Sequence, residues 1–168
     1  MPNWCNNNVS IRASKDIREE IKAKLMGSVF DGKWMTYEVR LFSFHSIIPQ
    51  PDELLHEKDA RRVNAPKTSA ELLEALTSKS NDNGDDWRSN NWGCKWETND
   101  VYRSETRDYL HYEFQSTWCP PEAIFLALSA MFPTATICAK FIEMGCIGSG
   151  AITYKGGKMI RETEYKRC

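Results

Sequence analysis

The chain contains no long apolar run and no marked excess of either charge. No apolar stretch approaches the roughly 20 residues that a membrane-spanning helix requires, so we expect no membrane contact. The N-terminal residues lack the charged and then apolar segments of a secretory signal, which predicts a cytoplasmic protein. The formal net charge is −1. This balance disfavours a strongly basic nucleic-acid-binding protein and allows only a local basic patch.

Cysteine and histidine lack the spacings that metal and redox sites use. None of the six cysteines belongs to a Cys-x-x-Cys pair, so we expect free thiols, mostly small buried side chains, in a reducing cytoplasm. The alternative is a zinc site built from scattered cysteines with His45, His56 or His111, which would lack the usual short-spaced ligand pairs. The sequence therefore predicts no metal and no cofactor.

The composition that is present is typical of one globular domain. The 168 residues are 41% hydrophobic and 27% charged, which suits a chain with a single core. A polar, weakly patterned stretch separates two better patterned regions. We predict a core formed by residues 1–50 and 101–168, with residues 51–100 as an insert.

Hydrophobic periodicity predicts the secondary structure. A period of two predicts strands, and apolar residues spaced four apart predict helices. The expected strands are residues 3–13, 39–48, 108–117 and 136–143, followed by a hairpin of residues 151–154 and 159–164. The expected helices are residues 15–26, ended by Gly27, and 122–131, with Pro120 or Pro121 in the first turn. Residues 81–90 are expected to form a polar loop, and Gly145 a turn or bulge.

The order of these elements predicts the fold class. Two successive strand–helix–strand units form most economically an antiparallel sheet with both helices on one face. We therefore predict an α+β fold of the ferredoxin-like plait type, with a partly helical central insert and a C-terminal hairpin.

Four tryptophans are the most informative aromatic residues. Trp92 and Trp96 are separated by Gly93, which disfavours a helical face shared by the two rings. One interpretation is that they pack with Trp4 and Trp118 and close the insert over the sheet. The other is a partly exposed platform that, with Lys95 alongside, stacks on a base or cradles a peptide.

Charge is distributed unevenly along the chain. Residues 81–100 carry five acidic and two basic residues, whereas residues 155–168 carry the reverse. Such an acidic insert could engage a basic surface on a partner. The predicted contact residues are Asp85, Asp86, Asn91, Trp92, Lys95 and Trp96. The residues predicted to have structural roles are Trp4, Gly93, Trp118, Pro120 and Gly145.

Four separated motifs resemble one known family. They are Met1-Pro2-Asn3-Trp4-Cys5-Asn6-Asn7, Asn91-Trp92-Gly93-Cys94-Lys95-Trp96, Ser116-Thr117-Trp118-Cys119-Pro120-Pro121 and Glu143-Met144-Gly145. In these the chain resembles the YubB-like family of bacteriophage and conjugative-plasmid proteins, which have a ferredoxin-like domain. The resemblance covers nearly the whole chain in order. It implies a mobile-element protein that acts inside a bacterial cell, and it supplies no reaction.

Three functions follow from these observations. The first is a non-enzymatic binding protein that inhibits or modulates a host protein, either a defence complex (an anti-CRISPR role included) or a nucleic-acid-processing protein. The second is a single-stranded nucleic-acid-binding module. The third is an enzyme that uses Cys119 with a nearby histidine, since a helix N-terminus can lower the pKa of a thiol. A dimer is possible if the terminal strand lies at a sheet edge.

Overall fold

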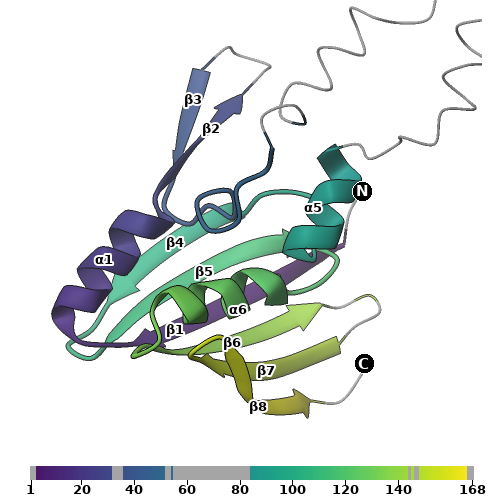
Figure 1. Cartoon of the computed structure of the whole chain (residues 1–168). Helices are drawn as coiled ribbons and strands as arrows, with labels where there is room; N and C mark the ends of the chain where they lie inside the picture. The colour runs from purple at the N-terminus through teal and green to yellow at the C-terminus, as the bar shows by residue number, and fades with distance from the viewer. Residues whose placement is uncertain are drawn as a thin grey trace, which may run out of the picture.

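The computed structural model describes residues 3–31, 36–51, 54, 84–143, 145 and 148–165. Within them it contains a six-stranded antiparallel sheet, a separate two-stranded hairpin and three helices (Figure 1). In chain order the elements are β1 (Trp4–Arg12), α1 (Lys15–Leu25), β2 (Gly27–Asp31), β3 (Thr36–Arg40), α5 (Gly84–Trp92), β4 (Asn99–Glu105), β5 (Tyr109–Thr117), α6 (Glu122–Met131), β6 (Thr136–Glu143), β7 (Gly148–Lys155) and β8 (Lys158–Tyr165).

The large sheet has the topology of a ferredoxin-like plait extended by a hairpin. Its strand order is β4-β5-β1-β6-β7-β8. Every neighbouring pair is antiparallel, so β4 is parallel to β1 and β6 is parallel to β5. Helix α1 connects the first parallel pair and α6 connects the second, which gives two interleaved strand–helix–strand units. The predicted α+β plait with a C-terminal hairpin is therefore confirmed.

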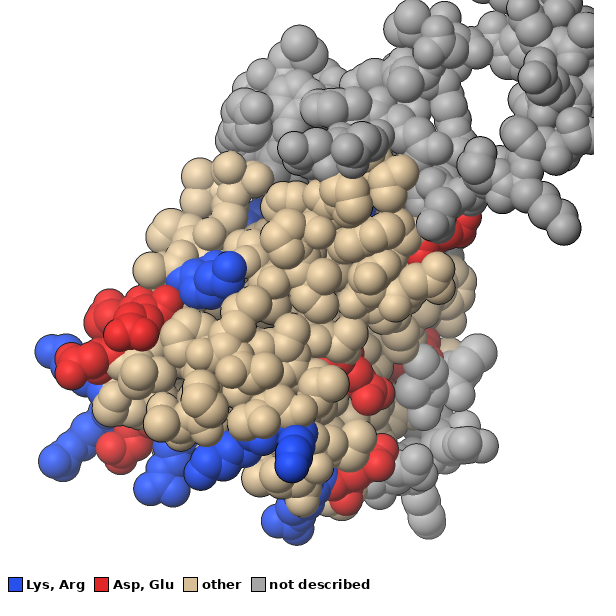
Figure 2. Space-filling view, viewed as in Figure 1, with Lys and Arg blue, Asp and Glu red and all other residues tan. Residues whose placement is uncertain are grey.

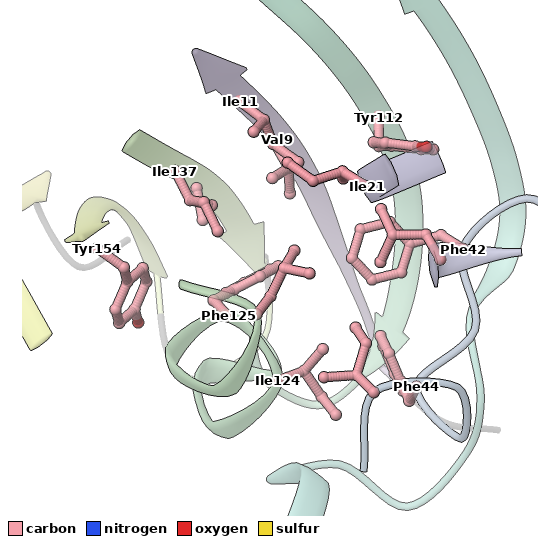
Figure 3. Packing of buried hydrophobic residues seen from close by; sticks show 14 of the residues in the cluster. Val9, Ile11, Ile21, Phe42, Phe44, Tyr112, Ile124, Phe125, Ile137 and Tyr154 are labelled. Atoms are coloured by element: carbon pink, nitrogen blue, oxygen red, sulfur yellow. The ribbon is translucent and has the colours of Figure 1, made fainter. Parts of the chain in front are cut away.

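The core lies between one face of this sheet and the helices. Val9 and Ile11 of β1 alternate with polar residues and point toward α1 and α6, because successive strand residues face opposite sides. Ile21 of α1 and Phe125 of α6 join the same cluster, which places both helices on one face (Figure 3). Each such apolar side chain contributes about 1.5–3 kcal/mol when fully buried. No helix among the described residues has the length and apolar character to cross a membrane.

The elements predicted most closely are those with one buried and one polar face. Helix α6 and strand β6 have the predicted bounds, and β5 begins one residue later than expected. The terminal hairpin turns at Gly156 and Gly157, which have φ values of 56° and 73°. Both values lie in the left-handed region, as in a two-residue type I′ turn, where glycine fits without strain.

The predicted strand at residues 39–48 is wrong, and the strand that replaces it in the plait was not predicted. Only Val39 and Arg40 are in a strand, and they belong to the separate β2–β3 hairpin. Phe42 and Phe44 instead enter the core from a loop, whose next turn is closed by hydrogen bonds from Ile47 and Ile48 N–H to the carbonyl of Phe44. The position beside β5 belongs to β4, which is exposed along most of its length.

Two further predictions are wrong, and one region is not described. Gly27 does not follow the end of α1 as a cap, since it is the first residue of β2 and Met26 is the C-cap. The polar loop predicted at residues 81–90 contains most of α5, which begins at Gly84 with Asp85 and Asp86 in its first turn. Residues 55–83 of the predicted insert lie outside the described residues.

Helix α1 is tied to the edge strand β4 by a charged cluster. Arg18 is buried, and its Nε lies 2.9 Å from Glu105 Oε1. The same guanidinium donates to the carbonyl of Ala13 at 2.7 Å, and Lys22 Nζ lies 3.0 Å from Glu105 Oε2. These contacts position β4 even though its own side chains bury little apolar area.

Candidate functional site

The four sequence motifs meet at one end of the sheet, which we call the tryptophan end. Trp4 of β1 lies beside Thr117 of β5, and Cys5 lies beside Glu143 of β6. Trp118 N–H donates to the carbonyl of Asn3 at 2.9 Å. The loop after α5 joins them through Lys95 N–H, which donates to Thr117 Oγ1 at 3.1 Å. Segments far apart in sequence thus form one local structure.

Trp92 is part of the core and is not a contact residue. Its side chain is only 1% exposed, and its Nε1 donates to the carbonyl of Ile48 at 2.8 Å. Its ring packs edge-on against Phe44 and Trp87, with centroid separations of 5.8 and 5.9 Å. The expected role of Trp92 in a binding surface is therefore wrong, because a fully buried indole has no face to offer a partner.

The other three tryptophans of the motifs are Trp4, Trp96 and Trp118, and they lie at or near the surface. The rings of Trp4 and Trp96 pack together with centroids 6.2 Å apart, and Trp96 is 38% exposed. Trp118 is 50% exposed and has a φ of 71°. This is a left-handed conformation that a bulky side chain rarely adopts, at a cost of roughly 1–3 kcal/mol. Trp118, predicted to be structural, thus projects an indole into solvent.

Hydrogen bonds hold the loops that carry Trp96 and Trp118. Gly93 ends α5 with a φ of 81°, the usual glycine conformation after a helix, so Trp96 leaves the helical path as the sequence predicts. The Cys119 thiol donates to the carbonyl of Gly93 at 2.8 Å and links the two loops directly. Pro120, in the second of these loops, is buried just before the N-terminus of α6.

A buried amide supports the second loop from beneath. Asn7 Nδ2 donates to Ser116 Oγ at 2.9 Å, and Ser116 Oγ donates to the carbonyl of Cys119 at 2.6 Å. On the neighbouring strand end, Gly145 N–H donates to Glu143 Oε1 at 2.8 Å. A Cβ at Gly145 would overlap Asn3 Nδ2 and Glu143 Oε1, so a side chain there would displace these two polar groups.

Arg88 fixes the position of Lys95 at the edge of this end. Its guanidinium donates to the carbonyl of Lys95 at 2.7 Å, to Gln50 Oε1 at 3.0 Å and to Asp85. Lys95 Nζ lies 3.1 Å from Asp85 Oδ2. Asp85 is therefore engaged within the fold, although it was predicted to be a contact residue.

Two other predicted contact residues, Asn91 and Asp86, differ in whether their side chains are bonded within α5 or exposed to solvent. Asn91 Nδ2 donates to the carbonyl of Trp87 at 2.8 Å along α5, so its side chain also has an internal partner. Asp86 is exposed on the first turn of α5. The structure therefore leaves Trp96, Lys95 and Asp86 of the predicted contact set at the surface.

Glu97 is a key residue that sequence reasoning did not identify. Its carboxylate accepts hydrogen bonds from Ser43 Oγ and from the N–H groups of Phe44, His45 and Thr98, at 2.7–3.2 Å. These bonds connect the loop before β4 to the loop that carries Phe42 and Phe44 into the core. A single glutamate in a polar stretch gives no sequence signal for this role, since its donors on Ser43, Phe44 and His45 lie more than 50 residues away in the sequence.

The thiols of the motif cysteines have raised pKa values, which disfavours the thiolate form that a nucleophile requires. Burial raises the pKa of Cys5 to about 12 and also raises the pKa of Cys94. The pKa of Cys119 is raised by burial first and by the charge of Glu122 second, despite its position before α6. The described residues contain no group of three metal-ligating side chains. The expected helix effect on the Cys119 thiol is therefore outweighed by desolvation.

We expect Cys119 to react slowly with iodoacetamide at pH 7, because its raised pKa leaves less thiolate than in free cysteine. The rate of modification, measured by mass spectrometry of the Cys119 peptide, should be several-fold below that of glutathione and should rise with pH. Faster labelling than that of glutathione at pH 7 would contradict this assignment and restore Cys119 as a candidate nucleophile.

Comparisons with known proteins identify the fold and no activity. A family model described as the ferredoxin-like domain in Api92-like protein matches residues 91–166. No curated protein matches the chain. The crystal structure of the protein Api92 from Yersinia pseudotuberculosis has a TM-score of 0.61 to this chain, with 11% sequence identity. The match covers 100% of this chain and 99% of that chain. The family model thus supports a ferredoxin-like domain over residues 91–166, and the structural match shows the same fold over the whole chain.

Proposed function

We propose that the chain is a non-enzymatic binding protein of a phage or plasmid that acts in the cytoplasm of a bacterial host. Its tryptophan end docks on a host protein that processes nucleic acid or carries out defence, a CRISPR complex being one example, and inhibits or modulates it. The mobile-element setting derives from the resemblance to YubB-like proteins. The choice of surface derives from the exposed indoles of Trp96 and Trp118.

Exposed tryptophans on rigid loops are the observation that carries this proposal. Trp is enriched among the residues that dominate the binding energy of protein interfaces. The Cys119–Gly93 and Lys95–Thr117 hydrogen bonds hold the two loops in place before any partner arrives. Preorganised loops lose little conformational entropy on binding, which favours affinity. The strained backbone of Trp118 maintains an exposed indole at a cost to stability, which favours a functional role for it.

The charge at this end favours a basic protein surface as the partner. Two cations, Arg88 and Lys95, lie there, and Lys95 is already paired with Asp85. Among the described residues, the carboxylates that reach the surface of this end outnumber them; they are Asp85, Asp86, Glu97 and Glu122, whereas Glu143 is buried. An acidic rim around exposed indoles complements a basic patch and repels phosphate. Nucleic-acid-binding surfaces are basic, so the proposed target is the nucleic-acid-binding surface of a host protein.

An affinity capture with paired variants tests this proposal. The double variant Trp96→Ala with Trp118→Gly removes both indoles, and glycine at position 118 also suits the positive φ, so the fold should persist. We expect the unmodified protein to capture a bacterial nucleic-acid-binding protein, and the double variant to lose it by at least 100-fold in affinity, since two hot-spot residues contribute about 2 kcal/mol or more each.

Leu126→Ala with Met131→Ala is the matched control, since both side chains are exposed and apolar but lie on α6. This variant should retain the captured protein.

A competition assay is the second test. Adding the unmodified protein should displace nucleic acid from the captured protein. Capture that survives loss of both indoles, or a captured protein whose nucleic-acid binding is unaffected, would contradict the proposal.

A further inference from the structure

The face of the sheet opposite the helices forms a second surface, which we call the open face. Strand alternation places on it the residues that pair in register with Asn6, Asn8, Ser10 and Arg12 of β1. None of the described helices packs on this face, because α1, α5 and α6 all contribute to the core on the other side. The open face adjoins the tryptophan end at Trp4 but differs from it in charge and composition.

One half of the open face carries aromatic rings and amides. The rings of Tyr109 and His111 on β5 are stacked, with centroids 5.7 Å apart and planes at 26°. Tyr102 on β4 is 70% exposed and pairs in register with Glu113, so it points to the same side. Flat rings on a sheet surface are platforms on which unpaired bases stack.

A row of amides crosses the same half and is fixed by its own hydrogen bonds. Asn99 Nδ2 donates to Gln115 Oε1, and Gln115 Nε2 donates to Asn6 Oδ1, both at 3.1 Å. In the next row Asn8 Nδ2 donates to Glu113 Oε1 at 3.0 Å. Each amide retains further donor or acceptor capacity that could meet base edges or ribose hydroxyls.

The other half of the open face carries unpaired cations. Lys140 of β6 pairs in register with Asn8, and Arg161 of β8 pairs with Thr153 in the row of Ser10. Arg12 lies two residues beyond Ser10 on β1, and Lys155 pairs with Lys158 next to the turn of the β7–β8 hairpin. Figure 2 shows basic side chains along the border of the molecule near this hairpin. None of these five cations is ion-paired with a described residue. The only described carboxylate in the rows paired with Asn6, Asn8 and Ser10 is that of Glu113.

We propose that the open face binds single-stranded RNA, with bases over β4, β5 and β1 and the phosphate backbone over β6, β7 and β8. The division into aromatic and cationic halves matches a strand whose bases and phosphates lie on opposite sides. The amide-rich surface favours RNA over DNA because it can hydrogen-bond the 2′-hydroxyl. A duplex hides its base faces, so it cannot use the aromatic half.

Fluorescence anisotropy with a labelled single-stranded RNA of about 10 nucleotides tests the proposal. Tyr102→Ala should weaken binding roughly five- to a hundred-fold, as expected for the loss of one stacked base, and Tyr102→Phe should restore it. Lys140→Ala with Arg161→Ala should lower the slope of log K against log salt by about 1.4, since each phosphate contact to a single strand contributes about 0.7.

Lys15→Ala with Lys24→Ala removes the same charge from α1 on the helix-bearing side and is the matched control. We expect it to leave the salt slope unchanged, and we expect duplex RNA and single-stranded DNA of the same sequence to bind several-fold more weakly. The proposal would be overturned if the control variant lowered the salt slope as much as Lys140→Ala with Arg161→Ala does. It would also be overturned if duplex RNA or DNA bound more tightly than single-stranded RNA, or if Tyr102→Ala left the affinity unchanged. These measurements do not involve the tryptophan end, so the RNA-binding proposal can be refuted while the proposed function stands, and the reverse.

Discussion

Replacing Trp92 by alanine is expected to lower the free energy of unfolding by about 4 kcal/mol. The indole is almost completely buried and packs against Phe44 and Trp87, so its removal leaves a large cavity between the loop after β3 and α5. It also removes the donor to the carbonyl of Ile48, which would remain without its indole partner. Urea denaturation followed by circular dichroism measures the loss. It would be seen as a lower midpoint with an unchanged slope.

Two matched substitutions separate this effect from a general loss of tryptophan. Trp96→Ala should cost only about 1 kcal/mol, since that side chain is partly exposed and loses mainly its contact with Trp4. Trp92→Phe should fall between the two, because it keeps a ring and loses the indole N–H. A Trp92→Ala protein as stable as Trp96→Ala would contradict the burial of Trp92.

The sequence predicts best those elements whose two faces differ in polarity. In β5, Leu110, Tyr112 and Phe114 face the helices while polar residues face the open side, so the period of two is visible. Strand β4 has no such signal, because it lies at the sheet edge and buries almost none of its side chains. Its place in the sheet is set by backbone pairing with β5 and by the Arg18–Glu105 contact.

The false strand at residues 39–48 has a specific cause. Phe42 and Phe44 are spaced two apart as in a strand, and both are buried. Ser43 between them is also buried, whereas the alternate residue of a half-exposed strand would face solvent. Its hydroxyl donates to Glu97 and its N–H donates to the carbonyl of Leu25. Periodicity alone cannot distinguish a strand from an irregular loop that happens to place every second ring in the core.

At the tryptophan end, the sequence predicts which residues are important but not which of them are buried. The motifs predict that Trp92 and Trp96 matter, and Gly93 predicts that they separate. Which ring is buried depends on the path of the chain after Gly93 and on the hydrogen bonds that Lys95 N–H and Cys119 make with distant partners. Such long-range contacts leave no signal in the local sequence, so the sequence alone cannot distinguish the buried ring of Trp92 from the partly exposed ring of Trp96.

The two proposed surfaces carry charges of opposite sign, although the chain as a whole is nearly neutral. The acidic tryptophan end suits a basic protein surface, and the cationic half of the open face suits phosphate. The net charge of −1 therefore conceals two regions of opposite sign. A binding protein with both could contact a nucleic-acid-processing protein and a strand bound to it at the same time, because the two surfaces adjoin at Trp4.

Replacing Glu97 by alanine is expected to lower the free energy of unfolding by about 3 kcal/mol. Its carboxylate accepts four hydrogen bonds, three of them from backbone N–H groups, and hydrogen bonds to a charged acceptor contribute about 1.5–3 kcal/mol each before screening by solvent. Glu97 is half-buried, so the total is well below four times that value. Loss of these hydrogen bonds should also weaken the packing of Phe42, whose ring centroid lies 4.8 Å from that of Phe114 in the core.

Glu97→Gln and Glu20→Gln make this prediction specific to the hydrogen-bonded carboxylate. Glutamine keeps the length of the side chain but turns one acceptor oxygen into a donor that faces other N–H groups, so it should cost about 2 kcal/mol. Glu20 is exposed on α1, and its replacement should change stability by less than about 0.5 kcal/mol. Denaturant midpoints of the three variants at pH 7 give the ranking. If Glu97→Gln matched the unmodified chain, the shape of the side chain and not its charge would hold the loop, and the proposed origin of Phe42 and Phe44 burial would fail.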